Sequence, residues 1–446
     1  MNLLSYTVLV RLLSPGLLAW MAVRARRSGG EWGVCSGPRF GRYPSTHPIV
    51  DPVWVHAVSL GETRAAQPFI QALLDQGRNV LLTHMTETGR AEGERAFARA
   101  IAQGRLVQQW LPYDFPGSSR RFIAHYRPIA GVLIEREVWP NLLAEAQRQN
   151  IPMILASARF SDNSLRQSLR AGSVMRRAYA SFAAVYAQTL HDAQRLEQAG
   201  ASAVRVSGNF KFDISLPQEQ IARGRQFADA LPRKIISIAS TREGEDDMFI
   251  RAIVRQVRRD QQQGKEEDQG VLYCLIPRHP QRFDEAAALL AKAGLPFVRR
   301  SQFVPMGDCT ASALRACGEA VVLLGDSLGE MPRYYAASQV AIVAGSFAPL
   351  GGQNLIEACA LGVPVIVGQH TRNFEQAVVD AIDEGAALRA TDAEAALQMA
   401  LQLLDDPQRL GRMGQAGAHW VQKHAGAVKR VVTGVNEIIT RRTQRA

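Results

Sequence analysis

The feature that most constrains the fold is an alternation of short apolar runs with amphipathic segments, which begins at Val53. The apolar runs have strand-like lengths and are Val53–Val58, Asn79–His84, Ile129–Ile134, Pro152–Ala156, Phe182–Ala187 and Val204–Val206. The segments between them place apolar residues at helical spacing, as in Arg64–Gln76, Leu142–Asn150 and Leu190–Ala199. Strands that alternate with helices predict an α/β fold with a parallel sheet.

The same rhythm restarts after a polar, proline-containing stretch, "DISLPQEQIARGRQ". The second series of strand-like runs is Ile235–Ala239, Val271–Ile276, Val321–Leu324, Val340–Ala344 and Pro364–Val367. We therefore predict two doubly wound, Rossmann-like domains that face a cleft, residues 29–215 and 216–446, with the last helices packing back on the N-terminal domain. No GxGxxG follows a strand, which argues against a dinucleotide oxidoreductase. The chain also lacks a Walker A sequence and a DxD that could hold a metal-bound sugar nucleotide.

The N-terminal segment is apolar from Leu3 to Val23 and ends in a basic cluster, Arg24, Arg26 and Arg27. No small-residue cleavage site follows it, so a signal peptide fits poorly. Arg11 and Pro15 interrupt it, which weakens the interpretation as a spanning helix. We predict that residues 1–28 form a membrane anchor, as a signal anchor or an interfacial helix. The trailing arginines place the rest of the chain on the cytoplasmic side, and a buried core helix is the alternative.

The charge and the cysteines narrow the choice of partners and compartment. The formal charge of +11 favours acidic partners, such as a phosphorylated substrate or an anionic membrane surface. A phosphate-bearing partner would suit the arginines of the N-terminal half, and a run of solvated helix faces is the structural alternative; these arginines are Arg120, Arg121, Arg127, Arg170, Arg176 and Arg177. Nucleic-acid binding would predict interleaved aromatic residues and a recognised module, and neither is visible. The five cysteines are scattered and form no CxxC, which indicates reduced thiols in a cytosolic setting and no zinc site.

A single carboxylate stands at the strand–turn–helix junction "VWVHAVSLGETRAAQPFIQAL", which begins at Val53. Glu62 follows the tight turn Ser59–Gly61 and precedes the apolar face of a helix. A carboxylate at a helix N-terminus is favoured for stability alone, and a carboxylate beyond a strand can also serve as a general base. Both interpretations stay open on these residues. We expect the helix dipole to lower the pKa of Glu62 and keep it ionised.

The most distinctive stretch of the C-terminal half is "GSFAPLGGQNLIEACALGVPVIVGQHTRNF", which begins at Gly345. Gly351 and Gly352 allow close approach to the backbone, and a helix is predicted to start near Asn354. The N-terminus of a helix offers free N–H groups to a phosphate. Asn354 and Glu357 also have the spacing of a capping box, which is the purely structural alternative.

Many motifs in one order resemble the Kdo (3-deoxy-D-manno-octulosonic acid) transferases of lipopolysaccharide synthesis. They are "HAVSLGE", "LPYDFPGSSRRF", "VLIEREVWPNL", "SARFSDNS", "GNFKFDI", "STREGED", "IPRHPQRF", "LLGDSLGEM" and "GGQNLIEACALGVPVIVGQHTRNF". The resemblance covers nearly the whole chain. It implies an inverting GT-B glycosyltransferase at the cytoplasmic face of the inner membrane, with CMP-Kdo as donor and the lipid A precursor (lipid IVA) as acceptor. The N-terminal domain would take the acceptor and the C-terminal domain the nucleotide.

The resemblance also implies roles for particular residues. Glu62 matches the catalytic base, and Glu135 and Lys211 match two residues that stabilise the transition state; an ion pair of Glu135 with Arg136 is the structural alternative. The stretches that match CMP contacts are Pro277, Arg278, Leu328, Gly329, Glu330, Asn354, Leu355, Ile356 and Glu357. The chain departs from the usual pattern at Arg136, Arg242, Gln353 and Leu355. No metal and no cofactor are implied.

Two other functions remain open on the residues. One is a GT-B transferase or epimerase that uses a UDP-sugar, which competition between CMP and UDP would distinguish. The other is a membrane-bound, non-catalytic sugar-nucleotide sensor, against which Glu62, Glu135 and Lys211 argue together. The number of Kdo residues transferred and the oligomeric state do not follow from the sequence.

Overall fold

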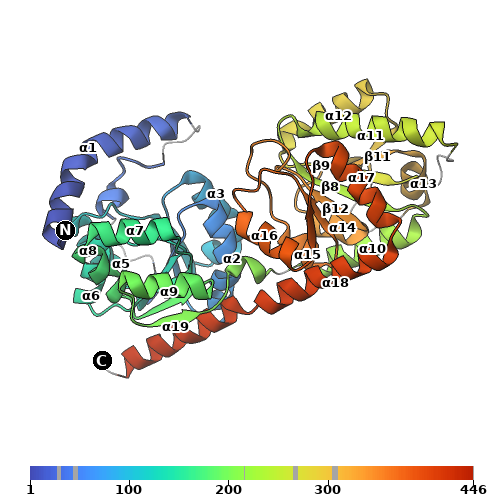
Figure 1. Ribbon diagram of the computed structural model, residues 1–446. Coiled ribbons are helices and arrows are strands. Elements are labelled where there is room, and N and C mark those ends of the chain that lie inside the picture. Colours follow the sequence, from blue (N-terminus) through green and yellow to red (C-terminus); the bar gives the residue numbers. More distant parts are fainter. Residues whose placement is uncertain (28–31, 44–48, 215, 265–269, 304–309, 445–446) are drawn as a thin grey trace. The chain divides into compact units, whose positions relative to one another are not determined.

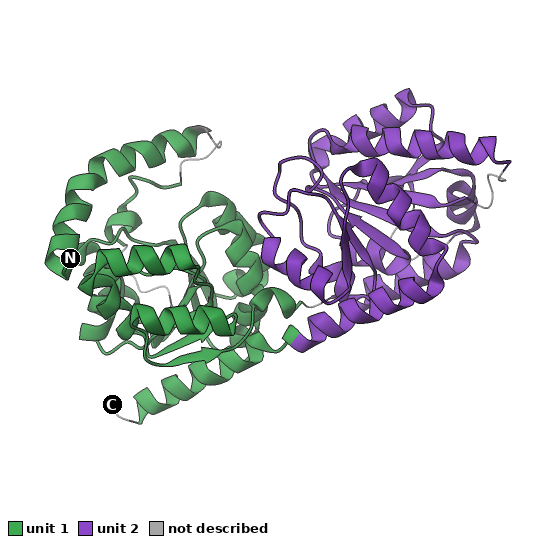
Figure 2. Cartoon of the chain, viewed as in Figure 1, with its two compact units in different colours: residues 1–214, 424–446 green, residues 215–423 purple. Residues whose placement is uncertain are grey.

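The computed structural model describes residues 1–27, 32–43, 49–214, 216–264, 270–303 and 310–444. The chain divides into two compact units, residues 1–214 with 424–446 (unit 1) and residues 215–423 (unit 2) (Figure 2). The prediction assigned residues 424–446 to the C-terminal domain, 216–446, whereas in the structure they belong to unit 1. Residues 28, 29 and 215, at the predicted boundaries, and Cys309 lie outside the described residues.

Unit 1 is built on a parallel sheet, of which the described residues form seven strands in the order β3-β2-β1-β4-β5-β6-β7. The strands are β1 (Val53–His56), β2 (Val80–His84), β3 (Leu106–Trp110), β4 (Ala130–Ile134), β5 (Met153–Ala158), β6 (Ala184–Ala187) and β7 (Val204–Val206). The chain runs outward from β1 to β3 and then returns to the other side of β1 at β4. The neighbours β1 and β4 thus form the topological switch point, where ligands of such sheets bind.

Helices cover both faces of this sheet, which explains why its strands are nearly continuous apolar runs (Figure 1). They are α2 (Leu60–Asp75), α3 (Glu87–Ala96), α4 (Ala98–Ala102), α5 (Pro116–Tyr126), α6 (Pro140–Arg148), α7 (Asp162–Ala171), α8 (Ser173–Ala180), α9 (Leu190–Ala199) and α19 (Ala427–Thr443), with the short 3-10 helices η1 (Gly37–Phe40) and η2 (Phe210–Phe212).

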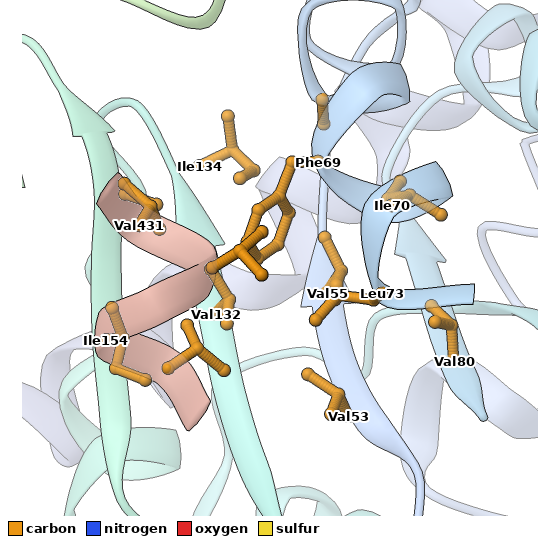
Figure 3. Packing of buried hydrophobic residues seen from close by; sticks show 14 of the residues in the cluster. Val53, Val55, Phe69, Ile70, Leu73, Val80, Val132, Ile134, Ile154 and Val431 are labelled. Carbon is orange, nitrogen blue, oxygen red and sulfur yellow. The ribbon is translucent and has the colours of Figure 1, made fainter. Parts of the chain in front are cut away.

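One core of unit 1 joins residues from the two ends of the chain. Figure 3 shows Val53 and Val55 of β1, Phe69 of α2 and Val431 of α19 in one buried cluster. Val432 and Val435 of α19 belong to the same cluster. Full burial of one large aliphatic side chain stabilises a fold by about 1.5–3 kcal/mol, so α19 is an integral part of unit 1.

Unit 2 repeats the architecture with a second parallel sheet, ordered β10-β11-β9-β8-β12-β13-β14 within the described residues. Its strands are β8 (Ile235–Thr241), β9 (Leu272–Pro277), β10 (Phe297–Arg299), β11 (Val322–Leu324), β12 (Val340–Val343), β13 (Val365–Val367) and β14 (Ala387–Arg389). The chain leaves β8 toward β9 and later returns to the other side of β8 at β12, so these two strands form the switch point.

The helices of unit 2 complete two parallel-sheet, Rossmann-like domains in one chain. They are α10 (Gln218–Ala230), α11 (Glu245–Gln262), α12 (Phe283–Lys292), α13 (Ala311–Glu319), α14 (Met331–Ala337), α15 (Ile356–Ala360), α16 (Glu375–Asp383), α17 (Ala393–Leu404) and α18 (Pro407–His424), with η4 (Pro280–Arg282) and η5 (Arg300–Gln302). The helix predicted to start near Asn354 begins at Ile356 instead and has five residues.

The N-terminal helix α1 (Leu3–Arg27) is long and apolar enough to cross a membrane, and little of it is buried. Its exposed large side chains include Leu4, Val8, Leu9, Leu12, Leu13, Leu17, Trp20 and Val23. The opposite, narrower side of α1 contacts the rest of unit 1. There the Tyr6 hydroxyl donates to Asp114 over 2.9 Å and the Thr7 hydroxyl donates to Asn141 over 2.8 Å.

Candidate active site

The switch point of unit 1 brings together the ends of β1 and β4. The two strands pair in parallel with His56 opposite Leu133, so the residues that follow them emerge at the same edge of the sheet. After β1 the chain turns into α2, whose first turn carries Glu62. After β4 it passes through Glu135 and Glu137 before α6 begins at Pro140.

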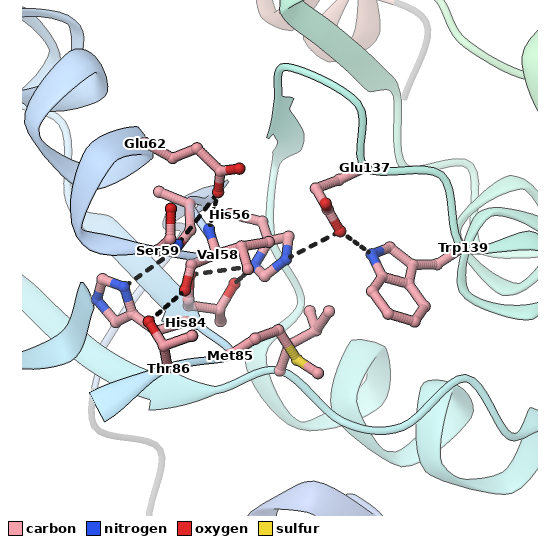
Figure 4. A network of polar contacts seen from close by, with 12 residues as sticks. His56, Val58, Ser59, Glu62, His84, Met85, Thr86, Glu137 and Trp139 are labelled. Atoms are coloured by element: carbon pink, nitrogen blue, oxygen red, sulfur yellow. Dashed lines mark hydrogen bonds and ion pairs between the residues drawn. The ribbon is translucent and has the colours of Figure 1, made fainter. Parts of the chain in front are cut away.

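Glu62 caps its helix with one of its two carboxylate oxygens. Oε2 accepts from the backbone N–H of Val58 (2.5 Å) and of Ser59 (3.2 Å), as Figure 4 shows. Among the described residues, Oε1 has no hydrogen-bond partner. The expectation of a lowered pKa is wrong: burial, followed by the charges of Glu135 and Glu137, raises the pKa of Glu62 to about 7. These effects outweigh the two backbone N–H groups, which act in the opposite direction.

Glu135 and Lys211 form an ion pair beside Glu62. Lys211 Nζ lies 3.5 Å from Glu135 Oε1, and the two side chains are 30% and 16% exposed. The carboxylate of Glu135 therefore pairs with Lys211 of η2, a residue that is far from it in the sequence. Glu135 itself has a φ of 62°, a left-handed conformation that is rare for a residue other than glycine and is concentrated at functional sites.

Lys211 owes its position to a short 3-10 turn, η2, that is fixed on both sides. The ring of Phe210 stacks on Phe69 of α2 with centroids 5.4 Å apart. The side chain of Asn209 accepts from the Lys211 N–H over 3.0 Å. The ring of Phe212 packs against His424, with centroids 5.0 Å apart. Phe210 and Phe212 are both buried.

Two residues beside this group escaped the sequence analysis, His56 and Glu137. His56 is fully buried, and its Nε2 lies 3.8 Å from Glu137 Oε2 (Figure 4). The same carboxylate oxygen accepts from Trp139 Nε1 over 3.0 Å. The only sequence signal for Glu137 is that it stands two residues beyond Glu135 in a loop that follows a buried strand.

The switch point of unit 2 is organised around backbone groups. Glu245, in the first turn of α11, is fully buried. Its Oε2 accepts from the N–H of Gly345 (2.6 Å) and Arg242 (2.9 Å), and its Oε1 accepts from Phe347 (2.9 Å) and Ala348 (3.2 Å). The carboxylate thereby holds the loop after β12. Sequence analysis did not find Glu245, because every partner but one lies about 100 residues away.

Glycines shape the rest of the loop after β12. Gly345, Gly351 and Gly352 have φ values of 72°, 94° and 80°. A Cβ on Gly351 would stand 2.5 Å from the amide nitrogen of Asn373, so the loop needs glycine there for both conformation and space. Asn354 Oδ1 accepts from the N–H of Ile356 over 3.1 Å, and the N-cap residue of α15 is Leu355, which makes no side-chain cap hydrogen bond.

The predicted nucleotide contacts in unit 2 fall into two groups. Leu355 and Ile356 have fully buried side chains, so only their backbone could meet a ligand. Glu330 is also buried and pairs with Arg300 at 3.1 Å and Arg333 at 3.5 Å, so its carboxylate is already neutralised.

The second group has side chains or backbone that reach solvent. Leu328 is 67% exposed, Gly329 is exposed, and Arg278, Asn354 and Glu357 are half-buried. Pro277 is buried at the end of β9. Burial raises the pKa of Tyr335 in α14; the charge of Glu357 also raises it, whereas that of Arg278 lowers it.

The described residues contain no group of three or more histidine, cysteine, aspartate or glutamate side chains that could hold a metal ion.

Comparison with known proteins places this geometry in a class. A family model described as 3-deoxy-D-manno-octulosonic-acid transferase (kdotransferase) matches residues 36–214, and one described as glycosyl transferases group 1 matches residues 309–420. The crystal structure of a glycosyltransferase from Rickettsia africae ESF-5 is 13% identical, with a TM-score of 0.51 over 87% of this chain and 99% of that chain. The fold and the family models define a glycosyltransferase with two Rossmann-like domains, the GT-B type.

Closer relatives define the family. The chain is 55% identical to the 3-deoxy-D-manno-octulosonic acid transferase of Bordetella pertussis over 434 residues, which are 97% of this chain and 98% of that protein. It is 28% identical to the protein of the same name from Haemophilus influenzae, over 96% of each chain. The chain belongs to the Kdo transferase family.

Proposed function

We propose that this protein transfers Kdo from CMP-Kdo to the lipid A precursor, lipid IVA, in the synthesis of the lipopolysaccharide core. Family membership supports the sugar that is transferred. The observation that carries the mechanism is Glu62, a carboxylate with one oxygen held by backbone N–H groups and the other without a partner among the described residues. A general base needs a fixed position and a free lone pair.

In the proposed reaction, the unpaired Oε1 of Glu62 takes the proton of an acceptor hydroxyl while that hydroxyl oxygen bonds to the anomeric carbon of Kdo. The bond from this carbon to the phosphate oxygen breaks, and CMP leaves with the electron pair. A single displacement of this kind inverts the anomeric configuration. A pKa near 7 suits a base that works at neutral pH, because it combines a substantial ionised fraction with adequate basicity.

Glu135 and Lys211 have complementary roles in this proposal. Lys211 brings a positive charge to the edge of the sheet where the reaction takes place, and Glu135 holds its ammonium group. Such a fixed cation stabilises the negative charge that develops on the departing phosphate. The left-handed backbone conformation at Glu135 is strained, and it sets the direction in which the side chain points.

We assign CMP to unit 2, at the switch point of β8 and β12. The proposed contacts are the side chains of Arg278, Asn354 and Glu357 and the backbone of Leu328, Gly329, Leu355 and Ile356. Pro277 would shape the end of β9, and Glu330 would hold its loop through Arg300 and Arg333. Because α15 has only five residues, the N–H groups of the glycine loop contribute more to phosphate binding than a helix dipole does.

The decisive experiment incubates the purified full-length protein with CMP-Kdo and tetraacyl lipid A precursor and identifies the products by mass. We expect the acceptor mass to grow by Kdo residues and CMP to appear in the same amount. CMP should compete with the donor and UDP should not. Competition by UDP alone, or tight CMP binding without any transfer, would contradict the proposal.

We further propose that the enzyme lies on the cytoplasmic face of the inner membrane, with α1 in the plane of the interface. Both ends of α1 contact unit 1. The carbonyl oxygen of Met1 accepts from the N–H of Val174 over 2.9 Å, and Met21 and Ala25 pack in a buried cluster with Tyr113. A helix held at both ends by one globular domain does not place those ends on opposite sides of a hydrocarbon core of about 30 Å.

Flotation with anionic vesicles tests this placement. Deletion of residues 1–27 should release the protein from vesicles at moderate salt. Because the deletion also removes the contacts of Tyr6 and Thr7, a milder variant is needed. Leu12→Glu with Leu13→Glu changes side chains that are 73% and 60% exposed and should release the protein as well. The matched control is Leu169→Glu in α7, which is 58% exposed and should leave binding unchanged. Undiminished flotation of the double variant would contradict the role of α1.

A further inference from the structure

Two buried histidines stand at the ends of neighbouring strands and differ in what their second ring nitrogen meets. His56 ends β1, His84 ends β2, and both are fully buried. Nδ1 of His56 lies 3.0 Å from the carbonyl oxygen of Thr83, and Nδ1 of His84 lies 3.0 Å from that of Ala57. A carbonyl oxygen only accepts hydrogen bonds, so each Nδ1 carries a hydrogen. In a neutral ring, Nε2 is then an acceptor.

The hydroxyl of Thr83 agrees with this assignment for His56. Thr83 Oγ1 accepts from Trp54 Nε1 over 2.8 Å and donates to the carbonyl oxygen of Val55 at 3.4 Å. The hydroxyl proton of Thr83 is therefore already used in a hydrogen bond. The hydroxyl oxygen, 2.9 Å from His56 Nδ1, serves as a second acceptor for the same ring N–H. The tautomer of His56 thus follows from the surrounding partners.

The Nε2 atoms of the two rings have opposite surroundings. With the Gln108 amide turned so that its NH₂ group faces the ring, that group donates to His84 Nε2 over 2.8 Å. His84 is therefore satisfied as a neutral ring, and burial lowers its pKa to about 4. His56 Nε2 has no hydrogen bond within the described part of the chain, and the group it faces is the carboxylate of Glu137 at 3.8 Å.

An acceptor lone pair that faces a carboxylate in a buried place is repulsive, and leaving it unsatisfied is costly. The contact becomes attractive when His56 carries a second proton and forms an imidazolium–carboxylate pair. Trp139 Nε1 donates to the same carboxylate and fixes its direction. The geometry thus sets a ring nitrogen that is unpartnered within the described residues against a fixed carboxylate.

The pair lies within the group of charges at the switch point. The other titratable or charged side chains that the surrounding elements bring to this edge of the sheet include Glu62 of α2, His84 of β2, Glu135 and Arg136 of the loop after β4, and Lys211 of η2. Glu137 acts on Glu62 directly, since its charge is one of the causes that raise the pKa of Glu62. His56 stands between the two carboxylates in Figure 4.

We propose that His56 and Glu137, held by Trp139, are positioning residues that tune Glu62 as the base of the transfer reaction. This inference rests on the proposed function. The negative charge of Glu137 favours the protonated form of Glu62, which is the form that the reaction produces. The positive charge of a protonated His56 partly offsets that effect, so that Glu62 is still ionised before the reaction.

A double-mutant cycle on the pH profile of kcat/KM tests the pair. His56→Gln leaves the charge of Glu137 uncompensated and should move the acid limb upward by roughly 0.5–1 pH unit, less than the 1–3 units typical of a directly contacting charge. Glu137→Gln keeps an oxygen for Trp139 but removes the charge, so His56 becomes neutral. In that background His56→Gln should shift the limb no further. His84→Gln is the matched control and should not shift the limb.

The same set of variants contains the results that would overturn the inference. A purely structural role predicts that His56→Gln lowers the rate by one factor at every pH. An equal shift in both backgrounds would mean that His56 acts without Glu137.

A spectroscopic readout separates this inference from the proposed function. The ¹⁵N shifts of the His56 ring, assigned by difference with His56→Gln in the full chain, should report an imidazolium at pH 7. They should report a neutral ring in Glu137→Gln. A neutral ring in the unmodified protein would overturn the pair whatever the enzyme transfers. Absence of Kdo transfer alongside an imidazolium would instead sink the proposed function.

Discussion

Glu62 and Glu245 occupy the same place in the two units and meet opposite surroundings. Each stands in the first turn of the helix that follows the first strand of a switch point, β1 in unit 1 and β8 in unit 2. Glu245 is fully buried, and its two oxygens accept from four backbone N–H groups. Glu62 accepts from two, with one oxygen only, and lies beside two further carboxylates.

The difference shows how one architecture supports two kinds of work. In unit 2 the carboxylate is satisfied and holds a loop, whose own backbone we propose to meet the ligand. In unit 1 the carboxylate is incompletely satisfied and its pKa is raised to about 7, so that it can exchange a proton near neutral pH. Position in the fold therefore does not determine the role of a residue; the number of its hydrogen-bond partners and the nearby charges do.

The largest expected effect tests Glu62. In Glu62→Gln, the amide oxygen still accepts from Val58 and Ser59, so the cap survives while the base is lost. We expect kcat to fall by about 10²–10⁴-fold. CMP affinity and melting temperature should change little. Measurement of kcat, CMP affinity and thermal stability on one preparation checks this. A stable, CMP-binding variant with a near-normal rate would make Glu62 a cap like Glu245.

The pH dependence of the unmodified enzyme should show the same carboxylate. With a pKa of about 7, Glu62 is protonated at lower pH, and kcat/KM should fall about tenfold for each pH unit below 7, or roughly 10²-fold at pH 5. Stability should change in the opposite sense. Since the pKa is raised above its ordinary value of 4.5, the contribution of Glu62 to stability is fully present below pH 4.5 and is lost as the pH rises through about 7.

Glu62→Gln is the control for both trends, because it removes the titrating group. Melting temperatures of the two proteins, measured from pH 5 to pH 8, should lie closest together at pH 5 and separate as the pH rises through about 7, because only Glu62 then becomes charged. An acid limb that stays near pH 7 in Glu62→Gln would assign the titration to another residue.

In unit 2, Arg278→Ala should raise the KM for the donor. Loss of one charge-assisted phosphate contact costs roughly 1.5–3 kcal/mol, or about 10- to 100-fold in affinity. The value of kcat should change much less, because the base lies in unit 1. Arg251→Ala on α11, where the arginine is 69% exposed, is the control. An unchanged donor KM would move the phosphate site away from the end of β9.

The smallest of these effects tests Glu245. Glu245→Gln retains the shape but replaces one accepting oxygen by a donor that faces backbone N–H groups. We expect a lower melting temperature and a donor KM raised roughly 3- to 10-fold, equivalent to about 1 kcal/mol of distortion in the loop. The acid limb of kcat/KM should stay in place. A shifted limb would mean that Glu245, like Glu62, takes part in proton chemistry.

The sequence predicted most of the local structure and little of the long-range electrostatics. Val204–Val206 and Leu190–Ala199 match β7 and α9 at both ends, because a short apolar run and an amphipathic segment are local signals. β3 was missed since Gln108 and Gln109 interrupt its apolar pattern, and β10 and β14 were missed since each offers only two apolar residues followed by an arginine. These strands take their conformation from their neighbours in the sheet.

The candidate site divides in the same way. The place of Glu62 at a helix start followed from the turn before it, but its pKa is raised first by burial in the folded chain and then by the charges of Glu135 and Glu137, more than 70 residues away. The pairing of Glu330 with Arg300, and of His56 with Glu137, likewise joins segments that no local pattern connects. Hydrogen-bond saturation, which distinguishes Glu62 from Glu245, is a property of the folded chain.

The contribution of α19 to the core of unit 1 has a consequence for biosynthesis. A chain emerging from the ribosome exposes residues 1–214 first, but Val431, Val432 and Val435, which complete their core, are among the last to be translated. Unit 2 is continuous in sequence, so it can finish folding while unit 1 still has an open apolar face. We therefore expect a chain truncated after residue 423 and released from the ribosome to show a protease-resistant unit 2 and a protease-sensitive unit 1. Equal resistance of both units at that length would show that the N-terminal half folds without its final helix.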